Sequence, residues 1–403
     1  MLRFKKEDGS FYPDWKKIKI NDLGEFIGGG TPSTKNKEYW TGDIPWLSSS
    51  DLEEENVNKI KISKYINKDA IEHSSTRLIT KDSVMIVSRV GLGKVAVCPC
   101  NLCTSQDFTS IVKNDNWNSK FLAYSLSVIM NHKKKESQGT AIKGVSTKDI
   151  KETPILLPNY EEQNKIAEFL TEIDNVIECS EKEVESLEQQ KKGLIQKIFS
   201  QEVRLKKEDG SEYPTWNIKR LKEIGSFSSG FGFNEKYQGN KDKDIMFFKV
   251  SDMNIKGNEI IMRSSNNTVD DDILSEMKLS KFTQNGILFA KVGAAIYKER
   301  KRLVYSNFLM DNNMMAFFPK NESLEFIYYL FCNTKFLKYA QTGALPSYNS
   351  SDLGSIKVNI PCIEEQKKIA DFLSSFDEAI DAAKEELETW KNIKKGLLQQ
   401  MFE

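Results

Sequence analysis

Two long segments of the chain carry apolar residues at alternating steps of four and three, the spacing of a helix that buries one narrow stripe against a partner. Pro158 precedes the first segment and Pro361 precedes the second. Each segment predicts a helix of about 60 Å, at 1.5 Å per residue. The two stripes are Ile166, Leu170, Ile173, Ile177, Ser180, Val184, Leu187, Lys191, Leu194 and Ile198, and Ile369, Leu373, Phe376, Ile380, Ala383, Leu387, Trp390, Lys394, Leu397 and Met401.

The stripes leave two arrangements open: each helix packs on its own globular domain, or the two helices pair with each other. The outer faces of both segments are acidic, which is typical of long solvated helices. Gly193 and Gly396 lie at equivalent places inside the two segments, where a glycine costs roughly 1 kcal/mol relative to alanine. A closely approaching backbone would explain both glycines. We therefore predict that the two helices pair with each other, antiparallel, as a coiled coil.

The stretches outside these helices follow a different pattern. Short β-branched and apolar runs, such as residues 82–90, 95–97 and 287–290, alternate with clusters of Gly, Asn, Ser and Asp. This alternation is typical of short strands connected by turns, with a few helices between them. We predict a mixed α/β (α+β) fold for these parts of the chain.

The whole pattern occurs twice. Residues 5–15 return as residues 206–216 with two differences, and the start of the first long helix, residues 161–170, returns at 364–373. An internal repeat of about 200 residues predicts two copies of one structural unit. We place globular domains at 1–157 and 203–360, and helical spacers at 158–202 and 361–403.

Length and charge narrow the possible functions. The 403 residues suffice for two domains, and 39% hydrophobic with 29% charged residues excludes a fully disordered chain. The 58 basic and 58 acidic residues balance, but acidic residues are in excess in the helical segments. The remainder is therefore basic, as expected of a protein that binds a polyanion such as DNA. We see no membrane-spanning run and no signal peptide, so we expect a cytoplasmic protein.

Catalytic and metal-binding motifs are incomplete. Cys98-x-Cys100-x-x-Cys103 has no fourth zinc ligand nearby, and we interpret these residues as buried or incidental thiols. His73 and His132 are the two histidines, and neither has a matched nucleophile. Neither a dinucleotide fingerprint nor a phosphate-binding loop is complete. We predict no catalytic residue, no metal and no cofactor for this chain.

Basic clusters favour a binding function instead. Such clusters are more often solvated surface, but contact with DNA phosphates is their natural function. Loops rich in small hydrogen-bond donors, at 31–35 and 140–143, are suited to base edges or phosphates. The candidate DNA-binding residues are Thr31, Ser33, Thr34, Lys35, Arg89, Lys94, Lys133, Lys134, Lys135 and Lys143 in the first copy, and Lys291, Lys298, Arg300, Lys301 and Arg302 in the second.

Taken in order, these segments resemble the specificity subunit of type I restriction–modification systems. The resemblance spans nearly the whole chain, and it is carried by the order of the motifs in both copies. The motifs are Gly28-Gly29-Gly30-Thr31-Pro32-Ser33, Tyr39-Trp40, Gly42-Asp43-Ile44-Pro45-Trp46, Ser50-Asp51-Leu52, Val87-Ser88-Arg89-Val90-Gly91, the Glu-Glu-Gln-x-Lys-Ile-Ala-x-Phe-Leu helix starts, and Lys-Lys-Gly-Leu at 191–194 and 394–397.

The resemblance implies two target recognition domains, each reading one half of a split DNA sequence, and two antiparallel helices that set the spacing between the halves. It implies three kinds of partner: double-stranded DNA, two modification (methyltransferase) subunits and restriction (endonuclease) subunits. S-adenosylmethionine, ATP and Mg²⁺ would bind to those partner subunits.

One departure from the family pattern and two rival functions remain. The second copy has Ser229-Gly230-Phe231-Gly232-Phe233 in place of the glycine-rich segment of the first, so we expect unlike half-sites and an asymmetric target. The chain could instead be a self-contained DNA-cleaving enzyme, which would need a metal site. It could also be a coiled-coil scaffold that never touches DNA.

Overall fold

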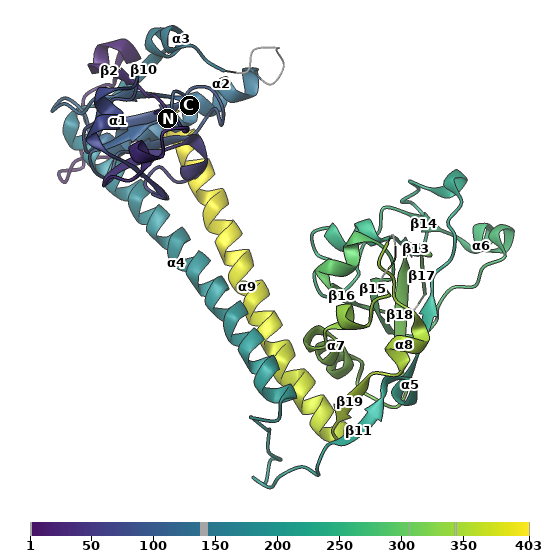
Figure 1. The fold of residues 1–403 in the computed structure, drawn as a ribbon. Coiled ribbons are helices and arrows are strands. Elements are labelled where there is room, and N and C mark those ends of the chain that lie inside the picture. Colours follow the sequence, from purple (N-terminus) through teal and green to yellow (C-terminus); the bar gives the residue numbers. More distant parts are fainter. Residues whose placement is uncertain (1, 138–143, 306, 342, 344, 403) are drawn as a thin grey trace. The chain divides into compact units, whose positions relative to one another are not determined.

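The computed structural model describes the whole chain except residues 1, 138–143, 306, 342, 344 and 403. The chain divides into two compact units, which are residues 1–183 with 383–403 (unit 1) and residues 184–382 (unit 2). Each unit contains one globular domain and about half of each long helix, α4 (Tyr160–Phe199) and α9 (Ile363–Phe402). Figure 1 labels these elements along the chain. The boundaries that we placed at 157, 202 and 360 stay a prediction.

The globular domain of unit 1 is built on two four-stranded sheets. One sheet is antiparallel with the strand order β2-β9-β6-β7, and the other is mixed, with the order β4-β3-β8-β5 and a parallel β3–β8 pair. A separate pair, β1 with β10, leads into α4. The elements are β1 (Lys16–Lys19), β2 (Phe26–Gly28), β3 (Ile44–Leu47), β4 (Lys64–Ile66), α1 (Lys68–Glu72), β5 (Leu78–Ile79), β6 (Val84–Val87), β7 (Val95–Val97), β8 (Leu102–Thr104), β9 (Phe108–Ile111), α2 (Ser119–Ser137), α3 (Thr147–Glu152) and β10 (Pro154–Leu157).

Strand β6 shows how the apolar sequence produces this core. All four of its residues are buried, because successive side chains of a strand point to opposite faces of its sheet. Val84 and Ile86 pack with α2 and the long helices, whereas Met85 and Val87 pack with residues of the second sheet. An uninterrupted apolar run is therefore the expected sequence for this position.

Unit 2 repeats the plan with the same strand directions. Its main sheet is antiparallel with the order β12-β18-β15-β16, and a three-stranded sheet has the order β14-β13-β17 with a parallel β13–β17 pair. β11 pairs with β19 as β1 does with β10. The elements are β11 (Asn217–Arg220), α5 (Leu221–Ile224), β12 (Gly225–Ser229), β13 (Ile245–Phe248), β14 (Thr268–Val269), α6 (Asp271–Met277), β15 (Gly286–Ala290), β16 (Lys301–Val304), β17 (Phe308–Met310), β18 (Met314–Pro319), α7 (Leu324–Asn333), α8 (Ser350–Gly354) and β19 (Lys357–Ile360).

The two long helices pair antiparallel, as predicted. In unit 1 the first half of α4 packs with the second half of α9, and Lys391 lies 2.9 Å from Glu181 across the pair. In unit 2 the second half of α4 packs with the first half of α9, where Lys191 forms an ion pair with Asp377. The predicted stripe positions are all buried or half-buried, which confirms the periodicity from which they were derived.

The predicted close approach of another backbone to Gly193 and Gly396 was wrong. Among the described residues, a Cβ atom on Gly193 or Gly396 would meet no heavy atom within 4 Å beyond its chain neighbours and its own helix backbone. The close approach of another backbone therefore does not explain these two glycines, although the pairing they were used to support is confirmed.

Both long helices begin with a buried polar anchor that explains the repeated Glu-Glu-Gln motif. Glu162 is fully buried and accepts hydrogen bonds from Arg3 and from Trp15 Nε1, the latter at 3.0 Å. Its counterpart Glu365 is also fully buried and binds Arg204 at 2.8 Å. The motif thus fastens the start of each helix to the hairpin that begins each copy, which is a structural function.

Candidate nucleic-acid interface

Five loops of unit 1 gather into one group, which we call loop cluster 1. Its members are residues 28–35, 48–51, 88–93, 105–107 and 144–147. Backbone hydrogen bonds tie them together: Gly30 N donates to Thr104 O at 2.8 Å, and Ser88 N donates to Asp107 O at 2.9 Å. Val145 N donates to Ser88 O at 2.8 Å. The cluster is therefore fixed by the backbone, which leaves its outward side chains available for a ligand.

Glycines are required in the glycine-rich segment because other backbone segments of the same domain approach it closely. A Cβ atom on Gly29 would lie 1.9 Å from Ser105 O, and one on Gly30 would lie 2.4 Å from the Ser75 carbonyl carbon. No side chain fits at those distances, so glycine is needed at both places. The indole N–H of Trp46 also donates to Gly30 O at 3.0 Å. The segment thus positions the following residues, Thr31 to Lys35, at the surface.

The turn between β6 and β7 presents two side chains to solvent. Leu92 N donates to Arg89 O at 3.0 Å and closes the turn, and Gly91 and Gly93 have φ values of +86° and +107°, which favour glycine. Arg89 is exposed, and Val90 is 70% exposed. An arginine beside an exposed aliphatic side chain can contact a guanine edge and a thymine methyl group in the major groove.

Unit 2 contains the counterpart, loop cluster 2, which comprises residues 229–233, 249–252, 290–293, 311–313 and 346–348. Its ties are equivalent: Gly230 N donates to Met314 O at 3.2 Å, and Lys291 N donates to Asn313 O at 2.7 Å. A Cβ atom on Gly230 would lie 2.0 Å from Asp311 O. Glycine is therefore needed here for the same reason as at Gly29, the close approach of another backbone segment. The framework repeats although the sequence on it does not.

The side chains on the two clusters differ. Lys291 occupies the place of Arg89, but its Nζ donates to Ser229 Oγ at 2.9 Å and it is half-buried. Val292, unlike Val90, forms a backbone bridge with Ser347 and is half-buried. The two clusters therefore offer different surfaces on a shared framework.

The structure places the predicted basic residues in three groups. Thr31, Ser33, Thr34, Lys35, Arg89, Lys135 and Lys298 lie at the surface or close to it, and Lys133 is half-buried at the end of α2. Lys134 pairs with Glu54, Lys291 binds Ser229, and Arg300 donates to Asn254 at 2.5 Å. Lys143 lies outside the described residues.

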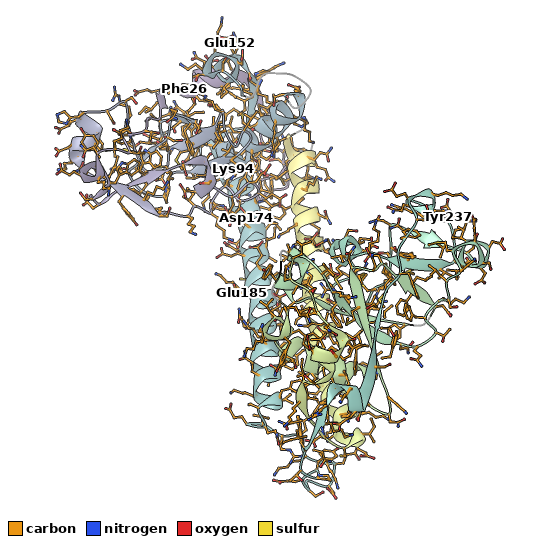
Figure 2. The ribbon with its side chains drawn as sticks, turned by 45° about the vertical axis from the view of Figure 1, so that its right-hand side comes forward. Phe26, Lys94, Glu152, Asp174, Glu185 and Tyr237 are labelled. Carbon is orange, nitrogen blue, oxygen red and sulfur yellow. The ribbon has the colours of Figure 1, made fainter. Side chains whose placement is uncertain are left out.

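The remaining predicted residues have structural contacts. Lys94, labelled in Figure 2, donates to the backbone oxygens of Ser49 and Leu52 at 3.0 and 2.7 Å and so holds the loop cluster. Lys301 is only 3% exposed, and burial lowers the pKa of its ammonium group. Arg302 is half-buried, and burial likewise lowers the pKa of its guanidinium group. In this structure Lys94 contacts the protein backbone, Lys301 is buried and Arg302 is half-buried.

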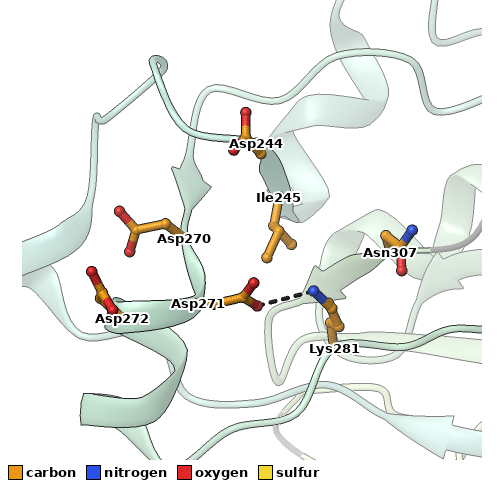
Figure 3. Close-up of a pocket in the computed structure, with 7 residues that line it drawn as sticks. All are labelled: Asp244, Ile245, Asp270, Asp271, Asp272, Lys281 and Asn307. Carbon is orange, nitrogen blue, oxygen red and sulfur yellow. Dashed lines mark hydrogen bonds and ion pairs between the residues drawn. The ribbon is translucent and has the colours of Figure 1, made fainter.

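A pocket of about 410 Å³ in unit 2 has the wrong charge for a DNA phosphate. Asp244, Asp270, Asp271 and Asp272 line it, together with Lys281 (Figure 3). Lys281 binds Asp271 at 2.9 Å, and Lys243 binds Asp270 at 2.7 Å. Because these lysines are already paired with carboxylates, the pocket is acidic, and we leave it out of the interface.

The thiols of the cysteine cluster at residues 98–103 are expected to be unreactive. Cys98 and Cys103 are fully buried, and burial raises the pKa of Cys98 to about 12 and that of Cys103 to about 11. A thiol that stays protonated at neutral pH is a poor nucleophile and a poor metal ligand. Within the described part of the chain, no group of three His, Cys, Asp or Glu side chains is placed to hold a metal ion. In the same part, no helix is both long and apolar enough to span a bilayer.

Sequence analysis missed the acidic partners of the two charged stripe residues. Lys191 and Lys394 are members of the two predicted stripes, but Asp377 and Asp174 were not assigned a place. In the structure these four residues form two ion pairs across the helix pair. A buried lysine needs a partner, so the two lysines in the stripes were the available signal.

The sequence is similar to that of proteins of one family along its whole length. A family model described as "Type I restriction modification DNA specificity domain" matches residues 12–189 and 213–389. The type I restriction enzyme MjaIX specificity subunit of Methanocaldococcus jannaschii is 30% identical over 417 residues, covering 99% of this chain and 95% of that protein. The MjaVIII specificity subunit of the same organism is 26% identical over 415 residues, covering 98% of this chain and 94% of that protein.

Two solved structures share the fold. One, from work on complex assembly and conformational transition of the type I R-M system, has a TM-score of 0.62 at 14% identity and covers 97% of this chain and 98% of that chain. The other is the S subunit of a type I restriction–modification system from M. genitalium, with a TM-score of 0.55 at 19% identity, covering 97% of this chain and 96% of that chain. At such identities the likeness concerns the fold.

Proposed function

The chain belongs to the type I restriction modification DNA specificity family, and we propose from this that it is the DNA sequence-recognition subunit of a type I restriction–modification complex. Each globular domain reads one half of a two-part DNA target. The observation that carries the proposal is the pair of loop clusters, which share one backbone framework but present different side chains. A repeated backbone framework with different exposed side chains is suited to binding two different DNA sequences.

The proposed DNA-contacting residues are those that the loop clusters expose. Arg89 and Val90 would contact base edges, and Thr31, Ser33 and Lys35 would contact bases or phosphates. Lys133 and Lys135 at the end of α2, and Lys298 in unit 2, are placed to contact phosphates. Because the two clusters differ at Arg89 and Lys291, the target is asymmetric.

Two DNA-binding domains on one chain bind DNA more tightly than either domain does alone. Once one half-site is bound, the second domain is held near its own half-site at a high effective concentration, so two weak contacts become one tight one. The antiparallel helices α4 and α9 act as the spacer between the readers. They also dock two modification subunits, with restriction subunits outside them.

Catalysis belongs to the partners in this proposal. We assign no catalytic residue to the chain. S-adenosylmethionine would bind to the modification subunits, and ATP and Mg²⁺ to the restriction subunits. DNA cleavage by the purified chain with Mg²⁺ alone would support the rival enzyme instead.

Methylome sequencing tests the proposal directly. Cells with the modification subunit and this chain should methylate adenines in one two-part sequence, and cells that lack this chain should not. A gel shift with the purified chain and modification subunit, on DNA containing that sequence, separates the reader from a scaffold. No shift at low salt, where phosphate contacts are strongest, would favour the scaffold.

A further inference from the structure

A tyrosine, an aspartate and a lysine meet in unit 1, and we call this group node 1. The hydroxyl of Tyr124 on α2 donates to Asp174 Oδ2 on α4 at 2.6 Å. Asp174 Oδ1 lies 2.5 Å from Lys394 Nζ on α9, and this Nζ lies 5.8 Å from the centroid of the Tyr124 ring. The side chains of Asp174 and Lys394 are 4% and 7% exposed. Figure 2 labels Asp174 on its helix.

Unit 2 contains the equivalent group, node 2. The hydroxyl of Tyr329 on α7 donates to Asp377 Oδ2 on α9 at 2.6 Å. Asp377 Oδ1 forms an ion pair with Lys191 Nζ on α4, and this Nζ lies 5.1 Å from the centroid of the Tyr329 ring. The side chains of Asp377 and Lys191 are 14% and 15% exposed.

Each node joins three elements at one point: a helix of the globular domain, α4 and α9. In node 1 the acid is on α4 and the lysine on α9, and in node 2 the two are exchanged. The carboxylate is the centre, because one oxygen accepts from tyrosine while the other faces lysine. Burial, with the nearby carboxylate, raises the pKa of both tyrosines, so both hydroxyls remain donors.

The two nodes fit a single helix register. Asp174 and Lys191 are 17 residues apart on α4, and Asp377 and Lys394 are 17 residues apart on α9. Both ion pairs are therefore formed together when the helices run antiparallel in one alignment. Any slip along the stripes would separate both lysines from both acids, and buried unpaired charges are strongly unfavourable. A polar group buried in a helix seam is known to fix register in this way.

We propose that nodes 1 and 2 are positioning sites that set how each globular domain is seated on the helix pair, and that they thereby restrict the gap between the two half-sites to one length. The inference rests on the proposed function. Asp174 and Asp377 hold the helix register, and Tyr124 and Tyr329 transmit it to the domains. None of the four contacts DNA.

The test uses the full chain with its modification subunits. Tyr124→Phe with Tyr329→Phe removes the hydrogen bond from the domain helix to the central carboxylate in each node but keeps the rings and the ion pairs. The matched control is Tyr160→Phe, because Tyr160 lies on α4 outside both nodes and both loop clusters and is 47% exposed. Methylome sequencing then compares methylation at the normal gap with methylation at gaps one base pair shorter or longer.

The double variant should raise the relative methylation of the shorter and longer gaps at least tenfold, with both half-site sequences unchanged, and Tyr160→Phe should match the wild type. A second pair of variants checks the register itself. Asp174→Asn should broaden the gap, because Lys394 loses its counter-charge, and adding Lys394→Gln should restore the single gap, because a neutral amide pair can keep the hydrogen bond.

Two results would overturn the inference. If the tyrosine and Asp174→Asn variants methylate less at every site but keep one gap, the nodes only stabilise the fold. If the wild-type complex methylates no two-part sequence at all, the proposed function fails, and the inference fails with it. The wild-type measurement therefore distinguishes the two failures.

Discussion

Nodes 1 and 2 have the same three residue types, yet their surroundings differ. In unit 1 the loop at 53–59 covers the node: Asn58 Nδ2 donates to Asp174 at 3.2 Å, and Lys394 Nζ donates to Glu55 O. Lys59 of the same loop pairs with Glu181 on α4 at 3.3 Å. Node 2 is more exposed, with Asp377 and Lys191 at 14% and 15% against 4% and 7% for Asp174 and Lys394, and its further contact is a 3.1 Å hydrogen bond between Tyr329 and Ser374.

This comparison indicates which features the two copies share. The groups that fasten a domain to the helices recur in both copies with similar geometry, as do the buried glutamates that start the helices. The loops that face outward differ. We infer that each globular domain is attached to the helices by the same contacts because the packing problem is the same in both copies. The two outward loop clusters differ because each binds a different DNA sequence.

Of the changes considered, exchange of one whole domain should have the largest effect on the recognised DNA sequence. Replacing residues 1–155 with the corresponding part of another family member that has a tyrosine at the place of Tyr124 should change one half-site completely and leave the other half-site and the gap unchanged. The reason is that loop cluster 1 lies entirely within those residues, while α4, α9 and loop cluster 2 are retained. Methylome sequencing measures the outcome, and a change in both half-sites would contradict separate reading by the two domains.

Removal of the central acid should affect the two nodes unequally. Asp174→Ala leaves Lys394 buried without its counter-charge and should lower the free energy of unfolding by about 3–5 kcal/mol. Asp377→Ala should lower it by about 1–2 kcal/mol, because water reaches Lys191 more easily.

Urea unfolding followed by far-UV circular dichroism measures both values. Glu178→Ala is the control on the same helix, because its ion pair with Lys182 is exposed and should contribute little. Equal losses for Asp174→Ala and Asp377→Ala would show that the covering loop adds no stability.

A smaller difference is expected between the two loop clusters. Arg89→Ala should weaken DNA binding by the assembled complex by about 1–3 kcal/mol and relax specificity at one base pair. Lys291→Ala should cost less, because Lys291 Nζ already binds Ser229. A gel-shift titration at fixed salt measures both, with Lys182→Ala on α4 as a control of equal charge change. A uniform loss for Arg89→Ala at every base pair would identify a phosphate contact instead.

The smallest effect concerns the thiols that distinguish the first copy from the second. With its pKa raised to about 12, Cys98 has a thiolate fraction on the order of 10⁻⁴ at pH 8. Iodoacetamide at pH 8 should therefore label the exposed Cys179 well before Cys98 or Cys103, and urea should remove the difference. Mass spectrometry of tryptic peptides reads the labelling. Rapid modification of native Cys98 would contradict the burial that raises its pKa.

Much of the architecture follows from local patterns in the sequence. The repeat, the two helices, their pairing and the buried strands β6 and β15 were predictable, because periodicity depends on neighbouring residues and a repeat is found by comparing the chain with itself. The start of α4 likewise depends on neighbouring residues, because the Asn159 side chain accepts from Glu162 N at 3.1 Å and caps the helix.

Other features depend on residues that are far apart in the sequence. Lys94 and Lys301 looked like ligand-binding residues, yet the first holds backbone oxygens of a distant loop and the second is buried. Gly193 looked like a contact with another backbone, but the space beside it is open. A residue type alone does not say whether a side chain faces solvent, a carbonyl or the core.

The sequence by itself determined that this protein has two similar halves joined through a pair of long helices. An apolar helix stripe is visible in the spacing of the residues, and a duplication is visible as a repeated sequence. Only the tertiary structure decided which charges lie at the surface and which are paired. Asp174 meets Lys394 across 220 positions of the chain, and such a pair is brought together by packing, not by local preference. The same holds for the loop clusters, whose members are brought together by hydrogen bonds between residues far apart in the sequence.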